Sequence, residues 1–498
     1  MSHLGGIAER DSLSFAQQTI QLKPFLPLSD TQNRTLINNF DKQGCIFKPI
    51  DVHTMLDCEP ERTMHHENID DIDDDTKLIR PPRAIFRQEF FGATLYDLDN
   101  HAMVFMDQIG ALIVAHMYNG ITLRELVGLL MERRYSRAQI IDSAIDLLSA
   151  GALKCGLASP QTLFRFVPAV DLREPFLQSP FAVELELTHG CYRACRHCAY
   201  NSSPTADRTN ELDTTQWKRA IQKLVNGGVM ELRFTGGDVL FRRDALELFS
   251  YADDLDVRFH FLSDTIALNP RSIDAVRRFR NLSFIGTSID GTNAETHDWM
   301  RGDGAFATLC SRIECLAEAG FKISLGATLH KKNWRTVREM GRVATAHGAT
   351  YFELGFLSPV GRGEQMSDYV LDGPEVRSAL DLYLEGIAAG EFIPLQSHYL
   401  RRVTQPDPFA DISEFIDRLP YQTEWPFSRL RIKPNGESYT AGKLRNTRLS
   451  QGTNILRDDL SAIWRLSPNL KYLREVGAGR RQHSLDITML AERGIGYE

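Results

Sequence analysis

The segment CYRACRHC, residues 191–198, follows directly on VELEL, residues 183–187, which reads as a short β-strand. It places three cysteines in one loop: Cys191, Cys195 and Cys198. Thiolates are the natural ligands of iron–sulfur clusters and of zinc. Three of them can bind three irons of a four-iron cubane and leave the fourth iron open. A structural zinc needs a fourth close ligand, for which His189 and His197 are the candidates, so the spacing favours a cluster.

Strand and helix patterns alternate around this loop. Six runs are predicted as strands: 183–187, 230–234, 257–262, 283–288, 321–329 and 351–357. Helices are predicted after Asp213, after Asp244, from Pro270, and near 304–319 and 333–347. Repeated strand–helix units predict an α/β fold with a parallel sheet and right-handed crossovers. Six units fit an open, partial (β/α)6 barrel over residues 175–375, with its chemistry at the C-terminal ends of the strands.

The C-x3-C-x2-C spacing after a first strand resembles the radical S-adenosylmethionine (SAM) superfamily. Three further motifs follow in matching order: TGGD (235–238), SIDG (288–291) and SPVGRG (358–363). The resemblance implies a 4Fe–4S cluster on the three cysteines and SAM as second cofactor. It assigns the SAM contacts to Gly236, Gly237, Asp238, Ser288, Gly361 and Arg362. Asp238 stands where the family usually has Glu.

Two neighbouring polar residues have plainer interpretations. His197 precedes the third cysteine, where the resemblance implies a packing residue whose backbone faces adenine. Asp264 follows the third strand, and we expect it to cap a turn or helix rather than to act as a catalytic acid.

The sequence pattern over residues 83–160 predicts a second domain. Turn signals at Phe91-Gly92 and Asp99-Asn100 separate short strands, and helices are predicted over 108–118, after Thr122 and after Ser136. This is the outline of a winged helix-turn-helix. A transcription regulator would carry a basic face, but the segment from Arg83 to Cys155 has seven Lys/Arg against eight Asp/Glu. The charge therefore argues against nucleic acid as a partner.

The segment GATLYDL…MERR, residues 92–134, resembles PqqD-like recognition elements, which bind the leader of a ribosomally made precursor peptide as an added strand. The resemblance implies that residues 83–160 bind a leader between the strand near Ala102–Met106 and the helix near Gln139–Ser149. A docking domain for the barrel remains the alternative.

The tail, residues 376–498, resembles the α+β SPASM domain in RIKPNGESYTAG (431–442) and TNILRDDLSAIWRLSP (453–468). Intact SPASM domains bind auxiliary iron–sulfur clusters through cysteines. No cysteine follows Cys315, and Ala441 stands where one is expected. The tail is therefore predicted to be degenerate, which leaves one cluster per chain.

Composition sets the remaining bounds. The 498 residues are 43% hydrophobic and 24% charged with a net charge of −8, as in a globular protein without general affinity for nucleic acid. No apolar run reaches the roughly 20 residues that span a membrane, and no secretory signal is visible. Eight cysteines are too few for a disulfide scaffold, so we expect a cytoplasmic protein. Residues 1–82 read as an extension with an acidic, solvated linker (57–77), where His65 and His66 lack metal-ligand spacing.

These observations predict a radical SAM enzyme that abstracts hydrogen from a precursor peptide, with epimerisation, cross-linking or desaturation as outcomes. Its partners would be the peptide and an electron donor such as flavodoxin or ferredoxin. Two alternatives stay open: a catalytically quiet peptide-binding escort, and a radical SAM enzyme with a non-peptide substrate. Cys310 and Cys315 are candidates for a hydrogen donor, although core packing also accounts for them.

Overall fold

The computed structural model describes two ranges of the chain. The first is residues 73–394, without 90–91, 100–101, 118–119, 134, 157–162 and 171–176; the second comprises residues 429–439, 445, 452–468 and 470. The predictions for His65, His66 and Ala441 lie outside these residues. Described residues up to 170 belong to one compact unit and those from 177 onward to another. Within the described ranges, no helix combines the length and apolar character that crossing a membrane requires.

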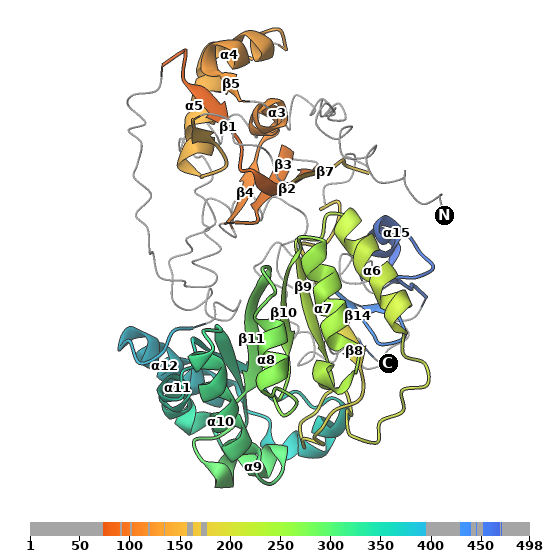
Figure 1. Ribbon diagram of the computed structural model, residues 1–498. Helices are drawn as coiled ribbons and strands as arrows, with labels where there is room; N and C mark the ends of the chain where they lie inside the picture. The colour runs from red at the N-terminus through yellow and green to blue at the C-terminus, as the bar shows by residue number, and fades with distance from the viewer. Residues whose placement is uncertain are drawn as a thin grey trace, which may run out of the picture. The chain divides into compact units, whose positions relative to one another are not determined.

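The N-terminal unit combines two small sheets with three helices (Figure 1). Its strands are β1 (Lys77–Ile79), β2 (Arg83–Glu89), β3 (Gly92–Asp97), β4 (Ala102–Met106), β5 (Ile121–Thr122), β6 (Lys154–Cys155) and β7 (Leu163–Val167). Its helices are α3 (Gln108–His116), α4 (Leu123–Met131) and α5 (Arg137–Ser149). The sheets have the strand orders β4-β3-β2-β7 and β5-β1-β6, so β4 is an end strand among the strands that the structure describes.

Local signals position these helices as predicted. Thr122 and Glu125 form a capping box that starts α4, and Ser136 and Gln139 form another that starts α5. The β5-β1-β6 sheet and the parallel pairing of β7 with β2 were not predicted. They depend on pairing between strands far apart in the sequence, which local patterns do not reveal.

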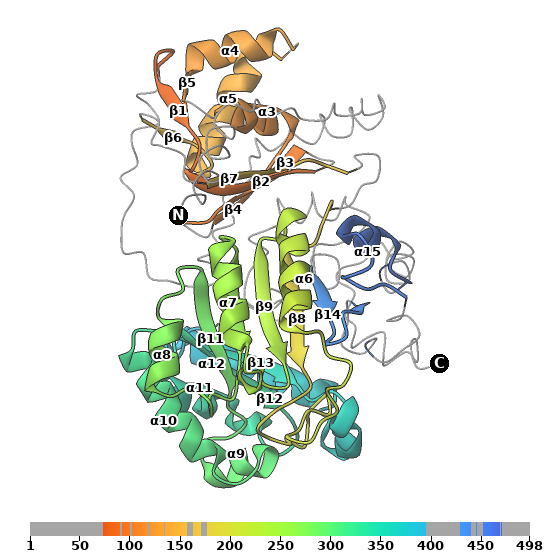
Figure 2. The ribbon, with the colours of Figure 1, turned by 45° about the vertical axis from the view of Figure 1, so that its right-hand side comes forward.

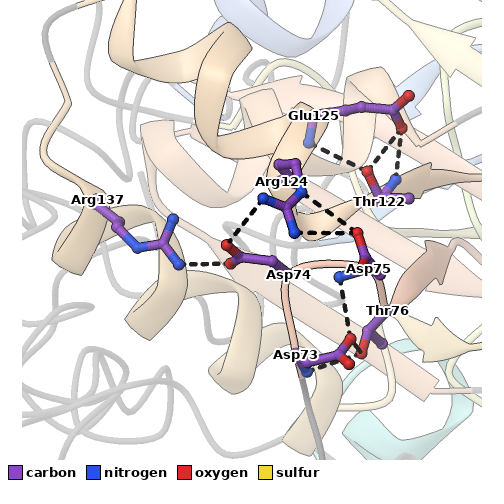
Figure 3. Close-up of polar contacts among 8 residues, drawn as sticks. All are labelled: Asp73, Asp74, Asp75, Thr76, Thr122, Arg124, Glu125 and Arg137. Carbon is purple, nitrogen blue, oxygen red and sulfur yellow. Dashed lines mark hydrogen bonds and ion pairs between the residues drawn. The ribbon is translucent and has the colours of Figure 1, made fainter.

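The last residues of the predicted acidic linker form a turn held against the unit (Figure 3), and Asp73 and Asp75 are exposed to solvent. The solvated linker itself stays a prediction. Asp74 forms an ion pair with Arg137 at 2.5 Å, and Asp75 forms one with Arg124 at 3.2 Å. The turn also binds through its backbone, because the Leu123 amide donates to the Thr76 carbonyl at 3.0 Å. The acidic run therefore leads directly into β1 and covers the start of α4.

The second unit is built on one continuous sheet. Six parallel strands follow one another in chain order: β8 (Ala182–Thr188), β9 (Glu231–Gly236), β10 (Arg258–Leu262), β11 (Leu282–Ser288), β12 (Ile323–Leu329) and β13 (Tyr351–Phe356). All six were predicted to within two residues at each end. Two tail strands, β14 (Arg429–Ile432) and β15 (Ser438–Tyr439), extend the sheet, because β14 pairs in parallel with β8. The predicted Asn435-Gly436 hairpin turn lies between them, and Gly436 has a φ of +85°.

Helices cover the sheet, and Figures 1 and 2 show α6, α7 and α8 along the same side of the strands that they connect. The helices are α6 (Thr214–Asn226), α7 (Ala245–Asp254), α8 (Pro270–Val276), α9 (Ala294–Arg301), α10 (Ala305–Glu318), α11 (Val337–Ala346) and α12 (Gly373–Ala388). Between α11 and α12 lies a 3-10 segment, η5 (Gly361–Tyr369). The α12 helix packs against α11, and a Cβ at Gly341 of α11 would lie 2.3 Å from the Phe392 ring. Packing therefore continues across residue 375, and the domain boundary predicted there stays a prediction.

Alternation along β8 divides the sheet into an apolar face and a polar face. Val183, Leu185 and Leu187 belong to the core under the helices, whereas Glu184 and Glu186 are buried among polar groups. Arg445 of the tail pairs with Glu186 at 2.7 Å. A buried carboxylate without a partner would be costly, so this ion pair ties the tail to the first strand.

Candidate functional site

The cysteine loop begins where β8 ends, and Glu211 holds its first residues. One oxygen of the Glu211 carboxylate accepts hydrogen bonds from the Thr188 hydroxyl at 2.9 Å and from the His189 amide at 2.6 Å. Further along, the Cys191 amide donates to the Ser203 carbonyl at 3.1 Å. The three cysteines therefore project from a backbone with its own hydrogen-bond partners. Glu211 carried no recognisable signal, because it is 22 residues from His189 in the sequence.

Arg362 braces the far side of this loop. Its guanidinium donates to the Cys195 carbonyl at 2.8 Å and to the Ser202 carbonyl at 2.7 Å, and its amide donates to the Cys198 carbonyl at 3.1 Å. Gly361 has a φ of +60°, and a Cβ there would lie 2.7 Å from the Cys198 carbonyl oxygen. Both residues were predicted to contact SAM; the structure places them against the cysteine loop, and the SAM contact stays a prediction.

The glycine pair at the end of β9 approaches the loop from the other side. A Cβ on Gly237 would lie 2.2 Å from the Gly190 carbonyl oxygen, which leaves no room for a side chain. Gly236 has a φ of +136°, and a Cβ there would meet the Thr188 carbonyl oxygen at 2.4 Å. The pair therefore lets two backbones lie in contact beside the cysteines.

Asp238 is buried, and its carboxylate is fully engaged within the chain. It accepts hydrogen bonds from the Leu240 amide at 2.9 Å, the Ser263 hydroxyl at 2.9 Å and the Asp264 amide at 3.0 Å. Burial, followed by the nearby Asp264 carboxylate, raises the pKa of Asp238 well above its ordinary value. Asp238 thus joins the loops after β9 and β10, and its predicted SAM contact stays a prediction.

Asp264 has the capping role that the sequence predicted. One carboxylate oxygen accepts a hydrogen bond from the Ile266 amide at 3.2 Å, and the other pairs with Arg193 of the cysteine loop at 2.9 Å. The turn after β10 is therefore linked to the loop that carries the cysteines.

Asp290 and Arg301 form a second buried pair that sequence reasoning missed. The Arg301 Nε atom lies 2.6 Å from Asp290, which has no exposed surface, and Asp290 also accepts from the Thr328 amide at 2.8 Å. Burial raises the pKa of Asp290, but the opposing charge of Arg301 outweighs it and holds that pKa at about 2. Within the same motif, the predicted contact Ser288 is half-buried and forms no side-chain hydrogen bond with the described residues.

The ion pair of Asp290 and Arg301 places positive charge beside the cysteine loop. The Arg196 amide donates to the Met300 carbonyl at 2.9 Å, which places the end of α9 against the cysteine loop. Burial raises the pKa of the Cys195 thiol, and the positive charge of Arg301 opposes that shift. Arg301 therefore favours the thiolate form of Cys195, which is the form that binds iron.

The three thiols suit a cluster better than a single ion. Burial raises the pKa of Cys191 to about 12, so without metal its thiol is protonated. No group of three His, Cys, Asp or Glu side chains converges on one metal position in the described part of the chain. In a cubane each thiolate binds a different iron, so convergence on one point is not required. The loop therefore fits a 4Fe–4S cluster, whose charge compensates the buried thiolates.

Three buried polar atoms at this edge of the sheet have no hydrogen-bond partner among the described residues: His197 Nδ1, His330 Nε2 and Ser358 Oγ. His330 is 1% exposed, and its Nδ1 accepts from the Lys332 amide, which leaves Nε2 as a donor. A buried polar atom costs free energy unless a ligand or water pairs with it. The edge therefore fits a polar ligand such as SAM.

The two hydrogen-donor candidates lie elsewhere. The α10 helix buries Ala305, Leu309 and Ile313, whereas Cys310 is half-buried and Cys315 is exposed, outside that buried face. The structure therefore does not bring either thiol together with the cysteine loop.

Residues 185–344 match the family model described as the radical SAM superfamily. This part of the chain is a radical SAM domain. Proteins of this superfamily use a 4Fe–4S cluster and SAM as cofactors. This agrees with the cysteine loop and with the unpaired polar atoms beside it.

Curated relatives match the region around this site. The antilisterial bacteriocin subtilosin biosynthesis protein AlbA of Bacillus subtilis is 27% identical over 203 residues, which cover 41% of this chain and 45% of AlbA. The AdoMet-dependent heme synthase of Methanosarcina barkeri is 32% identical over 191 residues, or 38% of this chain and 54% of that protein. The mycofactocin maturase MftC of Mycobacterium ulcerans is 28% identical over 319 residues, which cover 61% of this chain and 80% of MftC. The chain thus spans about half the length of the first two relatives.

One group of solved structures resembles the chain over most of its length. SuiB of Streptococcus suis, solved bound to its precursor peptide SuiA, has a TM-score of 0.62 and 15% sequence identity. The match covers 80% of this chain and 90% of SuiB. At this identity the likeness shows the fold.

Proposed function

We propose that this chain is a radical SAM enzyme that modifies a ribosomally made precursor peptide. The observation that carries the proposal is the braced cysteine loop, which Glu211 holds at its start and Arg362 holds further along, beside buried polar atoms without partners among the described residues. Two relatives are named for the biosynthesis of a bacteriocin and for the maturation of mycofactocin, and SuiB was solved with its precursor peptide. These likenesses favour a peptide as the substrate.

Each part of the site has a separate task in this proposal. Cys191, Cys195 and Cys198 would hold the cluster, and the loops after β9, β11 and β13 would hold SAM. Together, when bound, these cofactors supply a 5′-deoxyadenosyl radical by reductive cleavage of SAM. Arg301 keeps positive charge beside Cys195, and Asp290 keeps Arg301 in place. The fold thus positions the abstracted hydrogen and excludes water.

The N-terminal unit would recognise the leader of the precursor. Its β4 strand ends a sheet, and an end strand has backbone donors and acceptors that an added strand can bind. A Cβ at Gly110 of α3 would lie 3.0 Å from Met106 of β4 and 3.6 Å from Leu147 of α5. The end of β4 and the α5 helix therefore meet at α3, which supports a leader-binding groove and a winged helix-turn-helix arrangement.

The sequence of the tail favours a single cluster per chain, held outside the tail. No cysteine lies beyond Cys315, and the tail residues Arg445 and Tyr439 bind Glu186 instead of metal. A cysteine-free, SPASM-like tail that stabilises β8 is the form that we propose. The product is then formed without help from an auxiliary cluster.

The test is anaerobic incubation of the reconstituted enzyme with SAM, dithionite and a candidate precursor peptide. Formation of 5′-deoxyadenosine, followed by mass spectrometry of the peptide, separates the outcomes. Loss of two hydrogens would indicate a cross-link or desaturation, and gain of one deuterium in deuterated solvent would indicate epimerisation. A reconstituted enzyme that forms no 5′-deoxyadenosine would overturn the proposal.

A second candidate is radical chemistry on a substrate of heme biosynthesis, which the heme synthase relative favours. That match covers 38% of this chain, and it leaves the N-terminal unit without a role. The two candidates separate in one measurement, because only a leader-dependent enzyme should lose turnover when the leader is removed from the peptide.

A further inference from the structure

We propose that exposed cations beside the cysteine loop form a docking surface for a small acidic protein that donates single electrons. The basic surface consists of Arg196, Lys331, Lys332 and Arg335. This inference rests on the proposed function, because only a site that cleaves SAM reductively needs such a donor.

Two loops at the C-terminal edge of the sheet contribute these cations. The cysteine loop, residues 189–200, contains two arginines and no carboxylate, and the loop after β12, residues 330–336, contains two lysines and one arginine and no carboxylate. Arg193 is neutralised by Asp264 at 2.9 Å. The other four cations form the basic surface, in a chain whose overall net charge is −8.

Aromatic rings hold two of the cations close together. The Arg196 guanidinium lies 5.2 Å from the centre of the Trp299 ring, and the Lys332 ammonium lies 4.3 Å from the centre of the same ring. Trp299 is itself packed against His330 and Tyr369, with 5.3 Å between ring centres in each case. Cation–π contacts orient these charges without neutralising them.

The cations of the basic surface form no ion pair with the described residues. Arg196, Lys331 and Lys332 are exposed, and in the residues that the structure describes none has a carboxylate within 4.0 Å. The Asp298 carboxylate of α9 accepts from the Gly304 amide at 2.8 Å and the Phe306 amide at 2.7 Å, so it is directed toward the start of α10. The remaining acids nearby, Glu364 and Asp368, are exposed on η5. Like charges gathered on one ring repel each other, so an anionic partner gains by neutralising them.

The location identifies the kind of partner. Arg196 lies between Cys195 and Cys198 in the chain, so an anionic surface that binds here comes to rest against the loop that carries the cluster. The donor gives up one electron, the site gains one, and no atom is transferred. This chain is acidic overall, so its basic surface is where an acidic electron donor is attracted. The donor is thereby oriented as the two proteins meet.

The decisive variant reverses two charges that lie outside the SAM and cluster positions, Lys331→Glu with Lys332→Glu. Its matched control is Arg277→Glu with Arg278→Glu, because these exposed arginines follow α8 at the opposite edge of the sheet and the change in net charge is the same. The probe is a purified flavodoxin. We measure its affinity for the reconstituted enzyme at low and high salt, and 5′-deoxyadenosine formation with reduced flavodoxin or with dithionite.

We expect the Lys331/Lys332 variant to bind flavodoxin about tenfold more weakly at low salt and to lose most of the salt dependence, as for charge pairs at other interfaces. Its turnover with flavodoxin falls accordingly, its turnover with dithionite is unchanged, and the control variant behaves as wild type. A milder variant, Lys332→Gln, should show the same order of effects at smaller size.

Three results would overturn the docking surface: equal flavodoxin affinity in all variants, equal weakening in the control, or weakened affinity for precursor peptide in place of flavodoxin. Failure of the proposed function is distinguishable. Wild-type enzyme would then form no 5′-deoxyadenosine even with dithionite, whereas the contrast in flavodoxin affinity between the variants would still be measured.

Discussion

Two buried aspartates, each just beyond the C-terminal end of a parallel strand, have pKa values shifted in opposite directions. Asp238 after β9 is 1% exposed, and burial together with Asp264 raises its pKa well above the ordinary value. Asp290 after β11 is equally buried, but Arg301 holds its pKa at about 2. The same residue type therefore connects two loops through hydrogen bonds in one place and holds a guanidinium in the other. The difference shows that the partner decides the role of a buried carboxylate.

The largest expected effect comes from removing a cysteine of the loop that lies beside both aspartates. We expect Cys195→Ala to lose the cluster and all 5′-deoxyadenosine formation, because no other described thiol lies at its position. Cys315→Ala is the matched control, since Cys315 is exposed on α10. Iron content after anaerobic reconstitution checks both: about four irons in wild type and in Cys315→Ala, and a clear loss in Cys195→Ala. Full activity in Cys195→Ala would contradict the assignment of the loop.

Asp290→Asn should be the more damaging of the two aspartate substitutions. It leaves the Arg301 charge buried without its partner, which costs about 3–5 kcal/mol in comparable pairs. Chemical denaturation of the variant and the wild type measures the difference in the free energy of unfolding. The variant should also incorporate less iron, because Arg301 no longer has a fixed place beside Cys195. A loss of less than about 1 kcal/mol would show that the pair is solvated.

The pH dependence of stability should carry opposite signs for the two aspartates. The pKa of Asp290 is lowered from 3.8 to about 2, so its contribution is present above pH 3.8 and is lost as the pH falls toward 2. This shift corresponds to about 2 kcal/mol. The pKa of Asp238 is raised, so its contribution is greatest below the unfolded-state pKa and is lost as the pH rises through the folded-state pKa.

Unfolding measurements over a pH series check these signs. Asp290→Asn should reduce the pH dependence of stability at acidic pH. Asp238→Asn should reduce the loss of stability as the pH rises through the folded-state pKa of Asp238. The same profile in both variants would mean that neither carboxylate has the environment described.

Asp238→Asn should have the smallest effect. The Leu240 amide and the Asp264 amide donate to different oxygens of Asp238, and the Asn side chain has only one acceptor oxygen. One of these amides therefore loses its acceptor, and we expect a loss of about 1–3 kcal/mol, as for one buried donor without a partner. Thermal unfolding of the variant beside Asp290→Asn ranks the two directly. If Asp238→Asn proved the more destabilising, Asp238 would be ionised in the native state.

The sequence by itself determined the elements and their order. The six barrel strands, the capped helices at Asp213 and Ser136 and the cysteine spacing depend on residues within a few positions of one another, and local physical chemistry decides such features. The Asn435-Gly436 turn is of the same kind. The three candidate cluster ligands could be named for this reason, since all of them lie within eight consecutive residues.

Only the tertiary structure decided which distant residues support that loop. Glu211 and Arg362 bind it across separations of 22 and 167 residues. Arg301, paired with Asp290, adds positive charge beside Cys195. No local pattern marks these side chains as partners. The parallel pairing of β14 with β8 and the ion pair between Arg445 and Glu186 were hidden in the same way. Their cause is physical: a buried charge or an open strand edge must find a partner in space, and the sequence distance to that partner is unconstrained.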